Sequence, residues 1–332
     1  NWMYWVNFQP MLRRIYGCSF LPHHDYGKGG RGWRDLWQDC LALLAMDPEN
    51  VRQMLLDNFG GIRFDGTNAT IIGNKQGEFI ADRNNITRVW MDHGAWPFLT
   101  TKLYIEQSGD IEFLLEKQLY FKDLQVIRGE EKDNLWNLEQ GNNQLTEDGE
   151  TYEGNILEHL LIQHLTAFYD VGEHNVLRLH GADWNDALDM ASERGESVAF
   201  SALYAENLED IAELLKVIKD KMNIKNIQLA EEIQILLNVN TVEYNSVDKK
   251  LKVLKKYCEK CKHSITGKVI EIDCDTLIED IKGKAKWLKE HIRKNEWISN
   301  EEEFSWFNGY YDNNGRRVEG GTGNETRMML TG

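Results

Sequence analysis

The chain has 332 residues, 42% of them apolar, and a formal net charge of -16 at neutral pH. That length can hold two ordinary domains or one large domain with a sizeable core. The acidic excess argues against a nucleic-acid surface, which needs clustered Lys and Arg. No run approaches the ~20 apolar residues of a membrane-spanning helix, and the chain does not begin with a basic segment followed by an apolar one. We therefore expect a cytoplasmic protein with no nucleic-acid and no membrane partner.

Five cysteines, an odd number spread widely along the chain, do not form the pattern of a disulfide framework. Cys258 and Cys261 form a C-x-x-C motif with His263 and Cys274 nearby, but a second pair with the spacing of zinc ligands is missing. We therefore predict no metal site. The role of Cys258 and Cys261 stays open.

A basic, glycine-rich segment spans residues 27–39 with the sequence GKGGRGWRDLWQD. It contains the spacing G-x-G-x-x-G, but we reject a dinucleotide site because a poor strand precedes it and a helical chain follows. Glycines let a backbone approach a ligand closely, and Lys28, Arg31 and Arg34 form a tight cluster of positive charge. A helix starting near Asp35 would add the positive end of its dipole, which favours a bound anion. The segment can hold a phosphate or a sugar; the structural alternative is a glycine-rich turn in which Arg34 pairs with Asp35.

Two further helix starts are predicted in the first third of the chain. Asp47 as N-cap and Pro48 at the first helical position favour a helix that Gly60 ends. His93 and Trp96 lie at a second start beside a carboxylate and can line a pocket. A buried, hydrogen-bonded core histidine is the alternative for His93.

Apolar residues at helical spacing predict helices over residues 157–168, 208–218 and 281–292. The first is apolar around much of its circumference, as expected for an inner helix. The charge run at residues 249–256 is predicted to be a solvated face. The lysines predicted to stay outside on the last helix are Lys282, Lys284, Lys286 and Lys289.

Long polar loops are predicted at residues 63–76 and 132–151, and a short β hairpin near the C-terminus at residues 304–315, where Asn314-Gly315 is a hairpin signal. Long loops inside a compact helical domain tend to be functional. Helix pairs with tight connections on one side and elaborate loops on the other favour an all-α toroid. A plain helix bundle is the competing architecture.

The segment GADWNDALDM at residues 181–190 packs three carboxylates, an amide and an indole into ten residues. A protonated carboxyl can give its proton to a glycosidic oxygen, and the Trp184 indole can cover the apolar side of a sugar ring. The structural alternative is a turn that caps a helix. We expect Asp186 to move the proton, and Asp183 and Asp189 to orient the loop.

Residues 27–39 and 183–189 together resemble the paired signatures of the inverting glycoside phosphorylases of family 94, the cellobiose phosphorylase group. Residues 28–39, with YYDNNG at residues 310–315, resemble most closely the branch that acts on β-1,2-linked oligoglucans. The resemblance implies an (α/α)6 barrel that phosphorolyses a non-reducing terminal glucosyl unit to α-glucose 1-phosphate with inversion. Inorganic phosphate is then a co-substrate, and no cofactor is needed.

By that resemblance Asp186 matches the general acid, and Trp184 and Asp35 match residues that line the subsite of the transferred glucose. The phosphate-binding basic residue of this loop corresponds to Lys28 or Arg31, because the spacing differs from that of the family. The full set of candidate substrate-binding residues is Arg34, Asp35, Asp183, Trp184, His93 and Trp96.

A single acid fits phosphorolysis better than hydrolysis. An inverting hydrolase needs a second carboxylate ~6.5–9.5 Å away to activate water. Phosphate is already an anion and attacks the anomeric carbon without a carboxylate to activate it. A second carboxylate beside the phosphate would repel it. Asp186 must then have a raised pKa to be protonated near neutral pH, and burial beside Trp184 can raise it.

The Lys-Glu-Asn-Gly segment and the His that follow in the family are not found before Gly332, and the family's β-sandwich domain is not found before Asn1. We therefore expect residues 1–332 to form one partial barrel domain of a longer protein, incomplete at its C-terminal end and with its activity in isolation in question. Three alternatives stay open: an inverting β-glucan hydrolase using Asp92 or Asp189, the phosphorylase-like module of a membrane-bound cyclic β-1,2-glucan synthase, and an inactive sugar-binding fragment. Linkage, acceptor length, phosphate ligands and oligomeric state, a homodimer included, also stay open.

Overall fold

The structure is a computed structural model that describes residues 2–6, 8, 31–46, 48–73, 75, 77–81, 89–185, 191–237, 244–299 and 305–320. The chain divides into two compact units. The first unit comprises Asn1–Arg88, Trp96–Ile162 and Cys261–Gly267, and the second comprises Val89–Ala95, Gln163–Lys260 and Lys268–Gly332. In the part of the chain that the structure describes, no helix is both long and apolar enough to cross a membrane.

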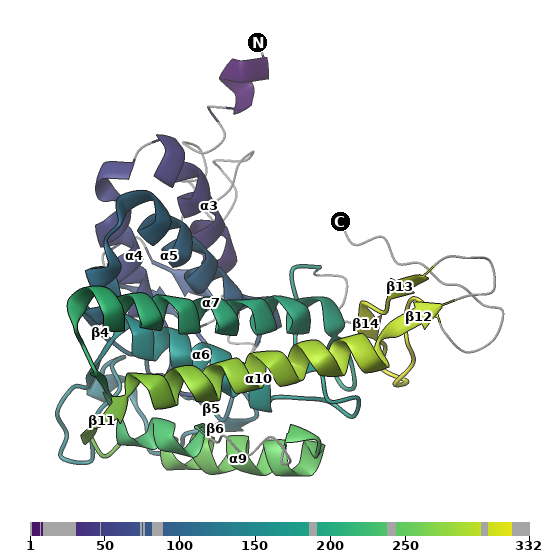
Figure 1. The fold of residues 1–332 in the computed structure, drawn as a ribbon. Helices are drawn as coiled ribbons and strands as arrows, with labels where there is room; N and C mark the ends of the chain where they lie inside the picture. Colours follow the sequence, from purple (N-terminus) through teal and green to yellow (C-terminus); the bar gives the residue numbers. More distant parts are fainter. Residues whose placement is uncertain are drawn as a thin grey trace. The chain divides into compact units, whose positions relative to one another are not determined.

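Helices dominate the described chain (Figure 1). The α-helices are α3 (Trp33–Met46), α4 (Val51–Phe59), α5 (Ala95–Ser108), α6 (Ile156–Tyr169), α7 (Val198–Met222), α9 (Val247–Lys260) and α10 (Cys274–Asn295). The 3-10 helices are η1 (Pro48–Asn50), η2 (Met91–Gly94), η3 (Ile111–Leu115), η4 (Leu138–Gln140) and η6 (Glu231–Ile235). The predominantly helical class is thus confirmed.

Small antiparallel sheets, most of which the sequence does not predict, connect these helices. One three-stranded sheet has the order β1 (Arg31–Gly32), β2 (Ile71–Ile72), β3 (Phe79–Ile80), and another the order β14 (Tyr310–Tyr311), β9 (Glu196–Ser197), β8 (Leu177–Arg178). The two-stranded pairs are β4 (Lys117–Leu119) with β7 (Glu153–Asn155), β5 (Gln125–Val126) with β6 (Glu131–Lys132), β10 (Asn226–Ala230) with β11 (Val269–Asp273), and β12 (Trp297–Ser299) with β13 (Ser305–Phe307).

An aromatic cluster forms the core of the first unit between α3 and α4. Trp33 and Trp37 lie four residues apart on α3 and therefore share a face, with ring centroids 5.7 Å apart in an edge-to-face arrangement. Trp37 makes a second edge contact with Phe59 of α4 at 5.1 Å. The predicted helix start at Pro48 is a 3-10 turn that leads into α4, and Gly60 ends α4 as expected. Asp47 lies outside the described residues.

The first of the two predicted long loops contains a buried ion pair. Arg63 donates to both carboxylate oxygens of Asp123, at 2.8 and 2.7 Å, and both side chains are buried. A buried guanidinium needs such a bidentate partner because desolvation of an isolated charge is costly. This pair orders a loop that has little regular structure of its own.

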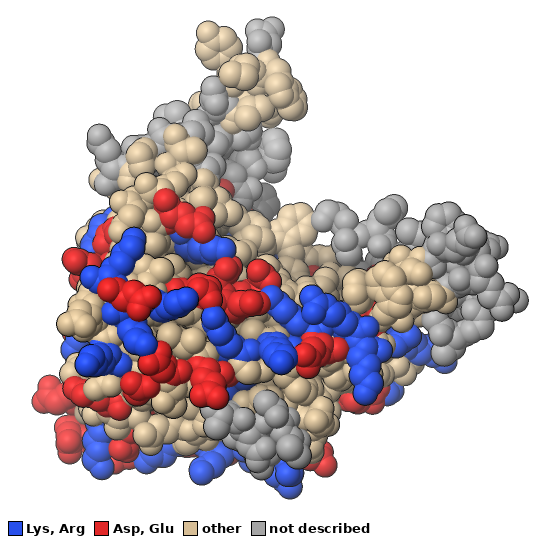
Figure 2. All heavy atoms as spheres, viewed as in Figure 1, with Lys and Arg blue, Asp and Glu red and all other residues tan. Residues whose placement is uncertain are grey.

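Every residue of α6 is buried, which confirms the predicted inner helix. In the second unit α7 and α10 run side by side and antiparallel (Figure 1). Ion pairs join Lys219 to Asp275, Lys282 to Glu213, and Lys289 to Glu206 and Glu209. Figure 2 shows the resulting mixture of basic and acidic side chains over these two helices. Exposed pairs of this kind are worth ~0.2–1 kcal/mol each, so they contribute less than the apolar stripe beneath.

Two lysines contradict the predicted solvated faces. Lys250 of α9 is 1% exposed and Lys284 of α10 is 0% exposed. The prediction was wrong because α10 is covered on two sides, by α7 and by the aromatic residues around Tyr244, so more than one stripe of the helix is buried. Lys284 pairs with Asp280 one turn earlier on the same helix.

The predicted turn at Asn314-Gly315 is confirmed, but the strands within residues 304–315 do not pair with each other, because β13 pairs with β12 and β14 pairs with β9. Tyr311 and Arg317 form an antiparallel bridge across the turn, and the Asp312 amide donates to the Arg316 carbonyl at 3.0 Å. Gly315 has φ 69°, a conformation that glycine adopts without strain. The Asn-Gly pair therefore determines this turn.

Candidate active site

The glycine-rich segment leads through β1 into α3 in the first unit. The helix begins at Trp33, two residues before the predicted start near Asp35, so Asp35 lies in its first turn, where a carboxylate stabilises the helix dipole. A Cβ on Gly32 would overlap the Asp35 carboxylate, so that side chain folds back against the junction of strand and helix. Lys28 and the side chain of Arg31 lie outside the described residues, and Arg34 and Asp35 are partly exposed.

Gly32→Ala is expected to displace the Asp35 carboxylate and to raise the KM for the glycoside roughly tenfold if Asp35 binds the substrate. A single well-placed hydrogen bond to a charged group is worth ~1.5–3 kcal/mol, and the lower end of this range corresponds to about tenfold. Gly283→Ala in α10 is the matched control, because a Cβ there meets nothing within 4 Å. That variant should gain about 0.5–1 kcal/mol of stability, since Ala is the better helix former. Equal KM values in both variants would show that Asp35 does not bind the glycoside.

The acidic segment is held in the second unit by backbone contacts with residues 89–91. The amide of Gly181 donates to the Val89 carbonyl at 2.7 Å, and the amide of Met91 donates to the Ala182 carbonyl at 2.8 Å. Tyr204 of α7 donates its hydroxyl to the Met91 carbonyl at 2.8 Å. Two segments distant in sequence are therefore joined immediately before Asp183.

Asp183 is an anchor inside the protein. It is 0% exposed, and its carboxylate accepts hydrogen bonds from the Asn185 amide at 2.8 Å, from the Ser197 hydroxyl at 3.0 Å and from the Tyr310 hydroxyl. Burial raises the pKa of Asp183, the charge of Asp92 raises it further, and the three donors lower it. These contacts support its expected role in orienting the loop.

The next residue, Trp184, points away from the interior and is 44% exposed. An indole exposed beside a fixed carboxylate is suited to contact the apolar face of a sugar. Asp186 and Asp189 lie outside the described residues, so the structure describes the chain on both sides of them, up to Asn185 and again from Ala191.

His93 and Asp92 lie on η2, which follows the segment that contacts the acidic loop. His93 is 6% exposed, and its ring stacks on Trp90 at 5.8 Å with an interplanar angle of 17°. Asp92 is fully buried. Trp96 lies in the first turn of α5 and is partly exposed.

The described candidates therefore fall into two groups. Arg34, Asp35 and Trp96 belong to the first unit, and His93, Asp183 and Trp184 belong to the second.

Sequence reasoning missed Ser197 and gave Tyr310 no role. Ser197 precedes the helical pattern of α7 and could have been found as its N-cap, because its hydroxyl accepts from the Phe200 amide at 3.1 Å. Nothing local in the sequence indicates that Asp183 is its other partner.

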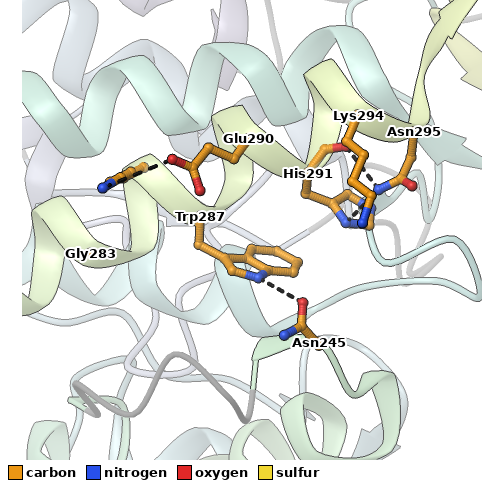
Figure 3. Close-up of a pocket in the computed structure, with 8 residues that line it drawn as sticks. Asn245, Gly283, Trp287, Glu290, His291, Lys294 and Asn295 are labelled. Atoms are coloured by element: carbon orange, nitrogen blue, oxygen red, sulfur yellow. Dashed lines mark hydrogen bonds and ion pairs between the residues drawn. The ribbon is translucent and has the colours of Figure 1, made fainter.

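A hollow of about 460 Å³ lies along α10 of the second unit, and Figure 3 shows that none of the candidate residues lines it. Its largest side chain, Trp287, donates from Nε1 to Asn245 Oδ1 at 3.1 Å and stacks on His291 at 4.9 Å. The centre of this ring also lies 3.9 Å from Lys250 Nζ. The Trp287 indole therefore makes most of its contacts within the protein.

Potential metal ligands do not cluster in the described parts of the chain: no group of three or more His, Cys, Asp or Glu side chains could hold an ion there. Cys258 and Cys261 are both buried and form no disulfide.

Comparison with known proteins places the chain in a family. The model of the glycosyl hydrolase 94 superfamily catalytic domain matches residues 3–248. The chain therefore belongs to this superfamily. A solabiose phosphorylase from Paenibacillus borealis is 26% identical over 220 residues, which cover 64% of this chain and 23% of that protein. The chain thus spans less than a quarter of the length of the curated relative that it matches.

Proposed function

We propose that the protein containing this chain phosphorolyses β-linked gluco-oligosaccharides and releases α-glucose 1-phosphate with inversion. The observation that carries the proposal is the acidic loop: Asp183 is fixed in the interior, Trp184 is exposed, and Asp186 follows two residues later. The family match and the name of the phosphorylase relative support the same class of reaction.

In the proposed reaction a phosphate oxygen attacks the anomeric carbon while the bond from that carbon to the glycosidic oxygen breaks. Asp186 gives its proton to the departing oxygen as general acid. Phosphate enters from the face opposite the leaving group, which converts the β-glycoside into the α-phosphate. The Asp186 carboxylate then takes up a proton from solvent before the next turnover.

The other candidate residues take the remaining roles. Arg34, Asp35 and Trp184 bind the transferred glucose, with His93 and Trp96 in support, and Asp183 orients the loop before Asp186. Lys28 and Arg31 hold phosphate, because a basic, glycine-rich loop at a helix start suits an anion.

We further propose that the helices belong to one (α/α)6 barrel domain, in a cytoplasmic enzyme that needs no cofactor and acts on β-1,2-linked glucans. The β-1,2 linkage rests on the resemblance of residues 28–39 and 310–315. The relative is named for solabiose, so the substrate panel must include that sugar.

The test is the phosphate dependence of glycoside cleavage by the full protein. With β-1,2-glucooligosaccharides or solabiose, we expect glucose 1-phosphate to appear only when inorganic phosphate is present. Cleavage at the same rate without phosphate would identify a hydrolase and overturn the proposal. Sugar binding without any cleavage would favour the sugar-binding alternative.

A further inference from the structure

We infer that Tyr310 is a positioning residue for the acid loop, residues 183–185, and that it acts through Asp183. This inference rests on the proposed function, since it concerns how the general acid of that reaction is held in place. The two residues are far apart in the sequence, and the second unit brings them together.

Pairing of two short strands builds the anchor. In the antiparallel register of β9 and β14, Tyr310 lies directly opposite Ser197. Side chains of directly opposed residues lie on the same face of a sheet, so both hydroxyls reach the Asp183 carboxylate. Ser197 also caps α7 by accepting from the Phe200 amide. The acid loop is therefore tied to the start of a 25-residue helix.

The Asn185 amide belongs to the acid loop itself and moves with it. Ser197 donates to Asp183 from the start of α7 and accepts from the Phe200 amide at the same time. Tyr310 is buried and donates from a separate strand, so it fixes the loop from outside. Its bond also lowers the pKa of Asp183, which burial and the charge of Asp92 raise.

The anchor bears on Asp186 through the chain, because only two residues separate Asp186 from Asp183. Three residue steps span at most about 11 Å of extended chain. A displacement of roughly 1 Å at a reacting group can lower turnover about 100-fold. Loss of the Tyr310 hydroxyl should therefore impair proton transfer more than substrate binding.

Tyr311 offers a matched control on the same strand. Its ring is also buried and its hydroxyl also donates to a buried carboxylate, that of Glu296, at 2.9 Å. Successive residues of a strand point to opposite faces, and Tyr311 stacks on His174 at 3.6 Å rather than reaching the acid loop. Tyr311→Phe therefore removes a comparable hydrogen bond without touching Asp183.

The experiment compares Tyr310→Phe with Tyr311→Phe in the full protein. For Tyr310→Phe we expect kcat to fall about 10–100-fold, with the KM for phosphate within roughly threefold of wild type. Hydrogen exchange should accelerate at residues 181–185 and not in α10. For Tyr311→Phe we expect kcat within roughly threefold of wild type and no change in exchange at residues 181–185.

Unchanged kcat and exchange in Tyr310→Phe, or equal losses in both variants, would overturn the inference. If Tyr310→Phe does not fold, Asp183→Asn, which keeps the side-chain shape, must show the same loss of kcat and the same faster exchange. A wild-type protein that never cleaves glycosides with phosphate would refute the proposed function instead. The exchange measurement would still decide whether Tyr310 anchors the loop.

Discussion

Asp186→Asn is expected to lower phosphorolysis of an oligosaccharide by about 10²–10⁴-fold while hardly changing the phosphorolysis of an aryl β-glucoside with an acidic phenol as leaving group. The range is the usual contribution of a positioned acid. A sugar alkoxide is a poor leaving group and needs the proton, whereas an acidic phenol departs as its anion. Initial rates on the two substrates, at saturating phosphate, give the comparison.

The control for this substitution is Asp148→Asn, the same chemical change on an exposed residue of the loop at residues 132–151. It should leave both rates unchanged. Equal losses on both substrates for Asp186→Asn would mean that Asp186 binds or orients the substrate and that another group supplies the proton.

Lys250→Met is expected to raise the free energy of unfolding by about 2 kcal/mol at pH 7, since apolar replacements of buried charged groups are often stabilising by ~1–4 kcal/mol. Burial holds the pKa of Lys250 well below its ordinary value, and the charge of Lys284 lowers it further. The Lys250 amine has no hydrogen-bond partner in the described chain and lies 4.1 Å from the Phe168 ring. Met has a similar length and removes the cost of burying this amine.

The pH dependence of this gain has a definite sign. Between the lowered pKa of folded Lys250 and the ordinary lysine value of ~10.4, the unfolded chain binds more protons than the folded one. Stability of the wild type therefore rises with pH through that window. Lys284, whose pKa burial lowers to about 8, adds a rise of the same sign above that pH. The advantage of Lys250→Met should thus be larger at pH 7 than at pH 9.5.

Chemical denaturation of the full protein at the two pH values measures both effects. Lys252→Met is the control, because Lys252 is an exposed lysine of the same helix α9. Its free energy of unfolding should differ from wild type by less than about 0.5 kcal/mol, as for most surface substitutions. Destabilisation by Lys250→Met at both pH values would show that the contacts of the amine with the aromatic rings outweigh its desolvation.

The sequence by itself determined the features that depend on local spacing. The apolar period determined α6, α7 and α10, and Asn314-Gly315 determined the C-terminal turn. The two dense motifs indicated the family that the comparison then showed. Each of these signals is contained in a few consecutive residues, so no knowledge of distant contacts is needed.

Only the tertiary structure decided which polar groups lie inside the second unit and what they contact. The charged run around Lys250 predicts a solvent-exposed helix face, yet aromatic rings from distant segments cover that lysine. Asp183 likewise has the kind of side chain that binds sugar hydroxyls, yet its hydrogen bonds go to Ser197 and Tyr310 within the protein. Burial and hydrogen bonding of a side chain depend on which remote segments pack against it, and local sequence patterns do not contain that information.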